Sequence, residues 1–149
     1  MINWKNLAVC ILIPLLLGFL SSLFGNSFDD IYKPNFTPPA IVFPIAWTIL
    51  YVLMGISSYL VYESDDKGKG DALLIYGIQL IINSLWSLFF FKLKWFLFST
   101  ILIVIILVLV IIMTLKFYKI NKLSAYLQVP YILWLIFALV LSYNVFLLN

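Results

Sequence analysis

The chain has 149 residues, of which 65% are hydrophobic and only 10% are charged, and its nine Lys and six acidic residues give a formal net charge of +3. Soluble domains contain about 45–50% apolar and about 25% charged residues, and a chain of this size buries only about two-thirds of the surface that it exposes when unfolded. The composition therefore excludes a soluble globule and a disordered chain, and it indicates a protein whose main solvent is lipid.

The residue types that carry most metal and acid–base chemistry are almost missing from the sequence. It contains no His and a single Cys, Cys10, which lies in an apolar run. Without a second Cys the chain forms no internal disulfide and no thiolate cluster, and without His it lacks the usual haem ligand and the usual general base. We therefore predict no bound metal and no cofactor. The scattered Lys residues are typical of membrane topology and not of nucleic-acid binding.

Five apolar runs follow one another, and each approaches the roughly 20 residues that a transmembrane helix needs. We expect an all-α membrane protein, a single domain over residues 1–149, whose five transmembrane helices cover about 7–24, 40–62, 72–91, 95–117 and 124–148. The runs are continuous and lack the period-two alternation of barrel strands. The first run also has the order of a signal peptide, but it is long for one and no Ala-x-Ala site follows it.

The connections between the runs differ in character. Residues 25–39 join the first two runs, and three Pro within residues 34–39 make this segment stiff and extended. Residues 63–71 hold six charged side chains, which places them in water. Lys92 and Lys94 mark a tight turn. The fourth run has no strongly polar residue between Thr100 and Thr114, so we expect it to face lipid.

The distribution of Lys predicts the orientation of the chain. Six Lys fall on the side of the N-terminus and three fall on the opposite side. Because cytoplasmic connections are enriched in Lys and Arg, we expect a multi-pass protein of the cell membrane with a cytoplasmic N-terminus. The Pro-rich connection then faces outward.

Three of the predicted helices carry a stripe of aromatic and polar side chains at helical spacing. The stripes are Trp47, Tyr51, Met54 and Ser58; Gln79, Asn83, Trp86 and Phe90; and Tyr131, Trp134, Ala138 and Ser142. Residues at these intervals share one helix face, and amides are costly in hydrocarbon without partners, so the stripes are expected to face the bundle interior. Aromatic faces with a few polar groups are typical of a pocket for a flat, largely apolar molecule.

Two interpretations of the stripes stay open at this point. The amides of Gln79 and Asn83 would also serve as interhelical hydrogen bonds, worth roughly 0.6–2 kcal/mol each. Trp and Tyr often mark the membrane surface, as we expect of Trp4 and Trp95. Packing and a ligand pocket are therefore equally compatible with the pattern. An ion path is disfavoured, because no charged residue lies inside any predicted span.

Several strings of the sequence resemble the TspO/MBR family, which includes the bacterial tryptophan-rich sensory proteins and the mitochondrial translocator protein. They are Lys-Pro-Asn-Phe-Thr-Pro-Pro at 33–39, Phe-Pro-Ile-Ala-Trp-Thr-Ile-Leu-Tyr-Val-Leu-Met-Gly at 43–55, Gln-Leu-Ile-Ile-Asn-Ser-Leu-Trp at 79–86 with Phe89 and Phe90, and Pro-Tyr-Ile-Leu-Trp at 130–134 with Phe137 and Ala138. The resemblance implies five transmembrane helices that enclose a ligand cavity, capped by the Pro-rich loop between helices one and two. It also implies a homodimer.

The same resemblance implies ligands and site residues. The ligands of the family include protoporphyrin IX and other tetrapyrroles, and in animals cholesterol and benzodiazepine-type drugs. Trp47 and Trp134 match two cavity tryptophans implicated in porphyrin chemistry, and they would be the catalytic residues if this chain degrades porphyrin. Taken together with the stripes, the expected ligand-binding residues are Phe36, Trp47, Tyr51, Gln79, Asn83, Trp86, Tyr131, Trp134 and Ala138.

The sequence also departs from the family pattern. Ser27-Phe28 stands where a Trp-Tyr pair is usual, and Leu141-Ser142 stands where Leu-Asn is usual. After Tyr143 no Lys or Arg follows. The proposed cholesterol motif needs a basic residue there, so it gives no support for sterol binding.

Two expectations concern how a porphyrin would be held. Without His a bound haem lacks its usual proximal ligand, so we expect selectivity for the ring and not for the iron. The stripes contain no cation, so the anionic propionates are expected to point toward the loop, where Lys33 is the only Lys.

Three functions from different classes follow from these observations. The leading one is a membrane protein that binds porphyrins and other flat hydrophobic ligands as a sensor, scavenger or carrier, in transport or in a stress response. The second is an enzyme that degrades protoporphyrin IX oxidatively under light. The third is a lipid-binding or structural scaffold. The expected partners are a hydrophobic small molecule, membrane lipid and a second copy of the chain.

Overall fold

The computed structural model describes residues 1–25 and 27–149. Its helices are α1 (Trp4–Ser22), α2 (Val42–Tyr62), α3 (Lys69–Ser87), the π-helical turn η1 (Leu88–Lys92), α4 (Phe96–Ile120), α5 (Lys122–Tyr126) and α6 (Val129–Leu148). Five segments are long and apolar enough to cross a membrane, with η1 extending α3 and with α5 and α6 forming one segment. The described residues contain no β-strand. The predicted all-α bundle with five membrane-spanning helices is confirmed.

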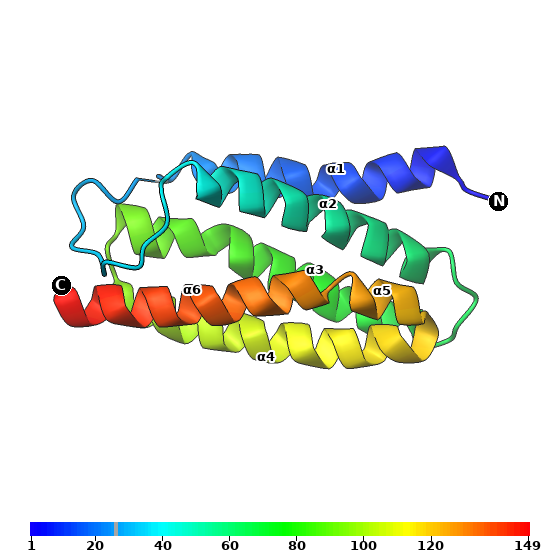
Figure 1. Cartoon of the computed structure of the whole chain (residues 1–149). Helices are drawn as coiled ribbons and strands as arrows, with labels where there is room; N and C mark the ends of the chain where they lie inside the picture. The colour runs from blue at the N-terminus through cyan, green and yellow to red at the C-terminus, as the bar shows by residue number, and fades with distance from the viewer. Residues whose placement is uncertain (26) are drawn as a thin grey trace.

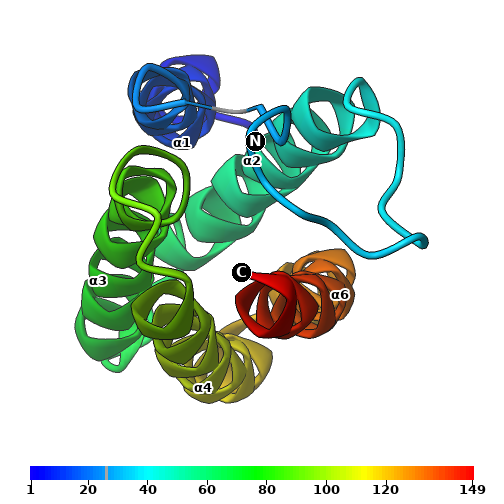
Figure 2. The same ribbon diagram turned by 90° about the vertical axis from the view of Figure 1, so that its left-hand side faces the viewer.

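The five segments lie side by side, as Figure 1 shows. The connection between α1 and α2 lies at the same end of the bundle as the C-terminus, and the N-terminus lies at the opposite end. Viewed along the bundle, the helices follow one another around a ring in the order α1, α2, α6, α4 and α3 (Figure 2). The aromatic and polar stripe residues of α2, α3 and α6 are all buried or partly buried in this bundle.

When η1 is counted with α3, the bounds differ from the expected spans by at most three residues, except at one place. The expected span 124–148 is divided in the structure, because α5 ends at Tyr126 and α6 begins at Val129. Pro130 lies in the first turn of α6. Its nitrogen carries no hydrogen, so an unbroken helix would leave the carbonyl of Tyr126 without its donor. The chain instead closes α5 with a short turn in which Gln128 N donates to Ala125 O at 3.0 Å.

Helices α1 and α2 approach each other closely where a glycine of one meets the backbone of the other. A Cβ added at Gly55 would lie 2.5 Å from Ile11 Cα and 2.7 Å from the carbonyl oxygen of Cys10. Pro14 lies inside α1, four residues after Cys10, and lacks the N–H that would normally bond that carbonyl. Gly55 and Pro14 together therefore allow a backbone-to-backbone contact between the two helices.

The expectation that the fourth span only faces lipid is wrong for one of its faces. Helix α4 packs against both α3 and α6. The side chains that it buries recur every three or four residues and comprise Ser99, Thr100, Ile103, Ile106, Val110, Met113 and Phe117. When a helix is apolar on every face, its sequence does not show which face packs against the neighbouring helices. Position in the ring, and not composition, decides which face of α4 is buried.

In the half of the bundle far from the α1–α2 connection, buried polar side chains form hydrogen bonds between helices. Gln128 Nε2 donates to Ser57 Oγ at 2.9 Å, and Ser57 Oγ donates to the carbonyl of Ser124 at 2.7 Å. All three residues are fully buried. Buried polar groups that are bonded to each other link helices in an apolar surrounding, so this network joins α2 to the α5–α6 segment below the aromatic stripes.

Candidate functional site

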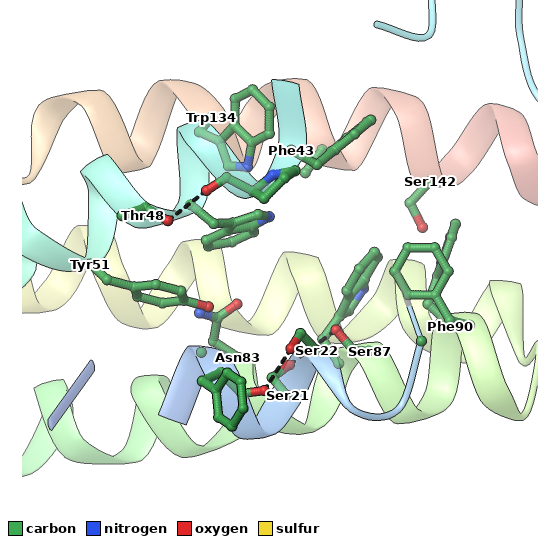
Figure 3. A pocket seen from close by; sticks show the side chains of 18 of the residues that line it. Ser21, Ser22, Phe43, Thr48, Tyr51, Asn83, Ser87, Phe90, Trp134 and Ser142 are labelled. Atoms are coloured by element: carbon green, nitrogen blue, oxygen red, sulfur yellow. Dashed lines mark hydrogen bonds between the residues drawn. The ribbon is translucent and has the colours of Figure 1, made fainter. Parts of the chain in front are cut away.

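A cavity of about 340 Å³ lies inside the bundle at the end near the α1–α2 connection. Figure 3 shows its side chains from close by. Its walls come from α1, α2, α3, η1, α6 and the connection, and α4 contributes none of them. The lining residues are Leu15, Gly18, Phe19, Ser21, Ser22, Gly25, Phe28, Phe43, Pro44, Trp47, Thr48, Tyr51, Asn83, Trp86, Ser87, Phe90, Phe91, Trp134, Phe137, Ala138, Leu141 and Ser142.

One wall of the cavity is a continuous aromatic cluster on α2 and α6. The ring of Trp47 stacks on Tyr51 with centroids 5.4 Å apart and meets Trp134 edge-on at 6.2 Å. Trp134 in turn contacts Phe43 at 5.9 Å and Phe137 at 5.4 Å. Rings at these separations hold one another in place. The wall is therefore a preformed set of flat, apolar surfaces.

The opposite wall is a second aromatic cluster, built on α3 and η1. Trp86 stacks on Phe90 with centroids 4.5 Å apart. Phe28 of the α1–α2 connection packs against Phe90 at 5.8 Å and against Phe43 of the first wall at 5.2 Å. Phe28 thus joins the two walls at the loop end of the cavity.

The polar groups of the cavity are mostly satisfied within the protein. Ser21 Oγ donates to Ser87 Oγ at 3.0 Å, and the indole nitrogen of Trp86 donates to the carbonyl of Ser99 at 3.2 Å. Two buried donors, Asn83 Nδ2 and Trp134 Nε1, have no hydrogen-bond partner among the described residues. Neither nitrogen is open to the cavity, because both are buried among the surrounding protein atoms.

No charged side chain of the described residues lines the cavity. The cavity therefore offers stacking surfaces, and its lining among the described residues contains no carboxylate or amine that would act as an acid or a base. Such a lining suits binding of a flat, largely apolar molecule.

Six of the side chains predicted from the sequence meet at this cavity. They come from three helices that are far apart in the chain and comprise Trp47, Tyr51, Asn83, Trp86, Trp134 and Ala138. The stripe spacing explains the result, because each stripe faces the centre of the ring. That these six residues contact a ligand stays a prediction.

Gln79 and Tyr131 lie outside the cavity, which does not support the expectation that they contact a ligand. Both are fully buried, and the hydroxyl of Tyr131 donates to Gln79 Oε1 at 2.8 Å. They continue the stripes of α3 and α6 into the part of the bundle where the helices pack fully. Periodicity gives the face on which a residue lies, but it does not say at which depth the cavity ends.

The two residues predicted on the loop also lie away from the cavity wall. Phe36 is about half exposed, and its ring contacts Phe137, a lining residue, at 6.5 Å. Lys33 is exposed. Phe36 therefore packs against the outer side of the wall. No contact between Lys33 and the cavity supports its assignment to the propionates.

Sequence reasoning missed the contribution of α1. Leu15, Gly18 and Phe19 line the cavity from that helix, and a Cβ added at Gly18 would overlap the ring of Tyr51. The signal that could have indicated this contribution was Gly18, a residue without a side chain inside an apolar run. In the structure the space beside Gly18 is filled by Tyr51 of the same chain.

Comparison with known proteins gives a consistent family. The family model of the TspO/MBR family matches residues 10–148. The chain is 34% identical to the tryptophan-rich protein TspO of Archaeoglobus fulgidus over 99% of both chains. It is 33% identical to the tryptophan-rich sensory protein of Cereibacter sphaeroides, over 82% of this chain and 76% of that protein. It is also 30% identical to the translocator protein of Sus scrofa, over 90% of this chain and 84% of that protein.

Proposed function

The chain belongs to the TspO/MBR family, and we propose that it binds porphyrins such as protoporphyrin IX, and other flat hydrophobic molecules, in the cavity between α1, α2, α3 and α6. The observation that carries the proposal is the ring of Trp47, which lines the cavity, stacks on Tyr51 and meets Trp134 edge-on. Three rings fixed by one another offer a planar ligand a surface that needs no rearrangement before it binds.

The size and the polarity of the cavity support the same class of ligand. Its volume of about 340 Å³ falls within the roughly 300–1,000 Å³ of small-molecule sites. The lining holds no acid–base pair, so the role that fits it best is that of a sensor, scavenger or carrier.

The test is a tryptophan-fluorescence titration of the detergent-solubilised protein with metal-free protoporphyrin IX in the dark. The variants Trp47→Phe and Trp134→Phe are compared with Trp4→Phe, because Trp4 is 71% exposed and lies far from the cavity in the chain's first turn. We expect saturable quenching in the wild type and in Trp4→Phe, and weaker affinity in the two cavity variants.

Linear quenching that is equal in all four proteins would mean that porphyrin only partitions into the micelle. The scaffold function would then be favoured, and a second measurement decides it. A ligand that binds only the native state raises the unfolding temperature. An unfolding temperature that no porphyrin changes would establish the absence of a specific site.

A second candidate function is light-dependent oxidative degradation of the bound porphyrin. It is favoured by the contacts of Trp47, whose ring touches Trp134, Tyr51 and Tyr131, the last at 6.3 Å. The oxidant would be molecular oxygen, whose atoms enter the opened porphyrin ring, and Trp and Tyr rings in contact are suitable one-electron partners of the excited pigment. If Trp47→Phe still binds protoporphyrin but forms no product under illumination, this function is supported. Equal product formation in both proteins would exclude Trp47 from the chemistry.

We also propose a cytoplasmic N-terminus in the cell membrane, and a homodimer. The first rests on the Lys distribution and is tested by labelling single Cys variants at Lys33 and Lys67 in intact cells with an impermeant reagent. Labelling at Lys33 alone supports the orientation. The second follows the family and is tested by the mass of the protein in detergent.

A further inference from the structure

The exposed part of the cavity lining belongs to two neighbouring helices. Only four of its lining residues have exposed side chains, namely Phe19, Ser22, Pro44 and Thr48. The first two belong to α1 and the last two to α2. We call this set the mouth. All four residues belong to segments that are long and apolar enough to cross a membrane, next to the end that the connection covers.

The mouth lies at a particular depth of the two helices. Ser22 is the last residue of α1, and Pro44 lies in the first turn of α2. Phe19 and Thr48 lie about one turn further from these ends, and at about 1.5 Å per residue the mouth extends roughly 6 Å along α2. If α1 and α2 cross the bilayer along their whole length, this depth corresponds to the boundary between the headgroups and the acyl chains.

The two hydroxyls of the mouth are already satisfied. Ser22 Oγ donates to the carbonyl of Phe19 at 2.6 Å, and Thr48 Oγ1 donates to the carbonyl of Pro44 at 2.7 Å (Figure 3). Each bond joins two mouth residues of one helix. A hydroxyl bonded in this way tolerates contact with lipid. The mouth is therefore compatible with a hydrocarbon surrounding although half of its residues are small or polar.

The end of the cavity that faces water is closed by the α1–α2 connection. Phe28 and Ile31 are 6% and 7% exposed and pack in one cluster with Phe90, Leu141 and Val145. The connection is also bonded to the end of α6, because Asn149 Nδ2 donates to the carbonyl of Tyr32 at 2.8 Å and Tyr32 N donates to Asn149 Oδ1 at 3.4 Å. Passage from water would have to break both sets of contacts.

We propose that ligands reach and leave the cavity from the bilayer through the mouth, while the α1–α2 connection stays closed. This inference rests on the proposed binding function and specifies its substrate class. The mouth fits a planar amphipathic molecule that lies at the membrane interface, with its ring among the acyl chains and its anionic edge among the headgroups. Such a molecule slides between α1 and α2 without passing through water.

The test measures the association and dissociation rate constants of protoporphyrin IX by rapid-mixing fluorescence with the protein in phosphatidylcholine vesicles. In Thr48→Phe, and in a Ser22→Phe Thr48→Phe double variant, we expect both rate constants to fall by about tenfold. A blocked passage slows exit as well as binding, whereas a lost contact raises the dissociation rate constant. Phe19→Ala widens the mouth, and both rate constants should rise.

The chain offers two matched controls. Thr114 makes the same bond to the carbonyl four residues before it, at 2.7 Å, and lies outside the cavity, so Thr114→Phe should leave both rate constants unchanged. Asn149→Ala releases the connection and should also leave them unchanged. The inference is overturned if Asn149→Ala accelerates both steps while the mouth variants do not slow them. Absence of saturable binding in the wild type would instead overturn the proposed function.

Discussion

The phenol of Tyr131 on α6 donates a 2.8 Å hydrogen bond to Gln79 Oε1 on α3, and both side chains are fully buried. The ring of Tyr131 also meets the ring of Trp47 edge-on. The pair therefore lies directly beneath the aromatic wall of the cavity and joins two helices that face each other across the bundle. The bond to Gln79 holds the ring of Tyr131 in place against the ring of Trp47.

We predict that Tyr131→Phe destabilises the protein without removing its ligand contacts. The change leaves the amide of Gln79, whose Nε2 already lacks a partner among the described residues, without any bond. A buried group left unpaired costs about 1–3 kcal/mol, so the free energy of unfolding in mixed micelles should fall by that amount. Affinity for protoporphyrin should change less than in Trp47→Phe.

Two further variants separate this effect from a general one. Tyr143 is also on α6 but is half exposed, so Tyr143→Phe should have almost no effect on unfolding. Adding Gln79→Leu to Tyr131→Phe removes the orphaned amide and should recover part of the loss. A large drop in affinity at unchanged stability would show that Gln79 and Tyr131 do touch the ligand.

We predict that replacing Gly55 by Ala destabilises the protein, whereas replacing Gly77 by Ala does not. In Gly55→Ala the new methyl meets the backbone of Ile11 and Cys10, which has no freedom to move aside, so α1 and α2 must separate. Overpacking of this kind costs about 1–3 kcal/mol. A Cβ at Gly77 meets nothing within 4 Å, so Gly77→Ala should unfold at the same temperature as the wild type or above it.

The fold was predictable because lipid restricts the chain to few solutions. An apolar run of sufficient length must form a helix that satisfies its own backbone, so the five helices follow from composition and length alone. The break before Pro130 and the packed face of α4 did not follow. The first depends on which carbonyl loses its donor, and the second depends on neighbours that a uniformly apolar helix does not reveal.

The helix faces that line the cavity were predictable, but the depth of the cavity along each helix was not. Helical spacing placed Trp47, Asn83 and Trp134 on faces that converge, and these side chains do meet. The same spacing included Gln79, which lies below the cavity. Gly18 of α1 was missed as a wall residue, because its role depends on the close approach of Tyr51. The depth of a cavity along a helix is set by packing between helices, which a single sequence does not display.

Metal-free protoporphyrin IX should bind about as tightly as haem. The chain has no His, and the one phenol on the cavity wall belongs to Tyr51, whose ring is held in a stack by Trp47. We expect dissociation constants within about threefold of each other and a haem Soret band without the shift of axial ligation. A shifted band that disappears in Tyr51→Phe would contradict this, because it would identify an iron ligand.

Lys33 provides a test of where the propionates lie. It is exposed on the connection and outside the cavity wall, so its attraction for a carboxylate acts through water. Exposed charge pairs are weak and screened by salt. We therefore expect Lys33→Ala to weaken protoporphyrin binding by at most about fivefold at low ionic strength, and less at high ionic strength. Binding of the dimethyl ester, which carries no charge, should not change. Equal affinities of wild type and variant for both compounds would show that the propionates lie elsewhere.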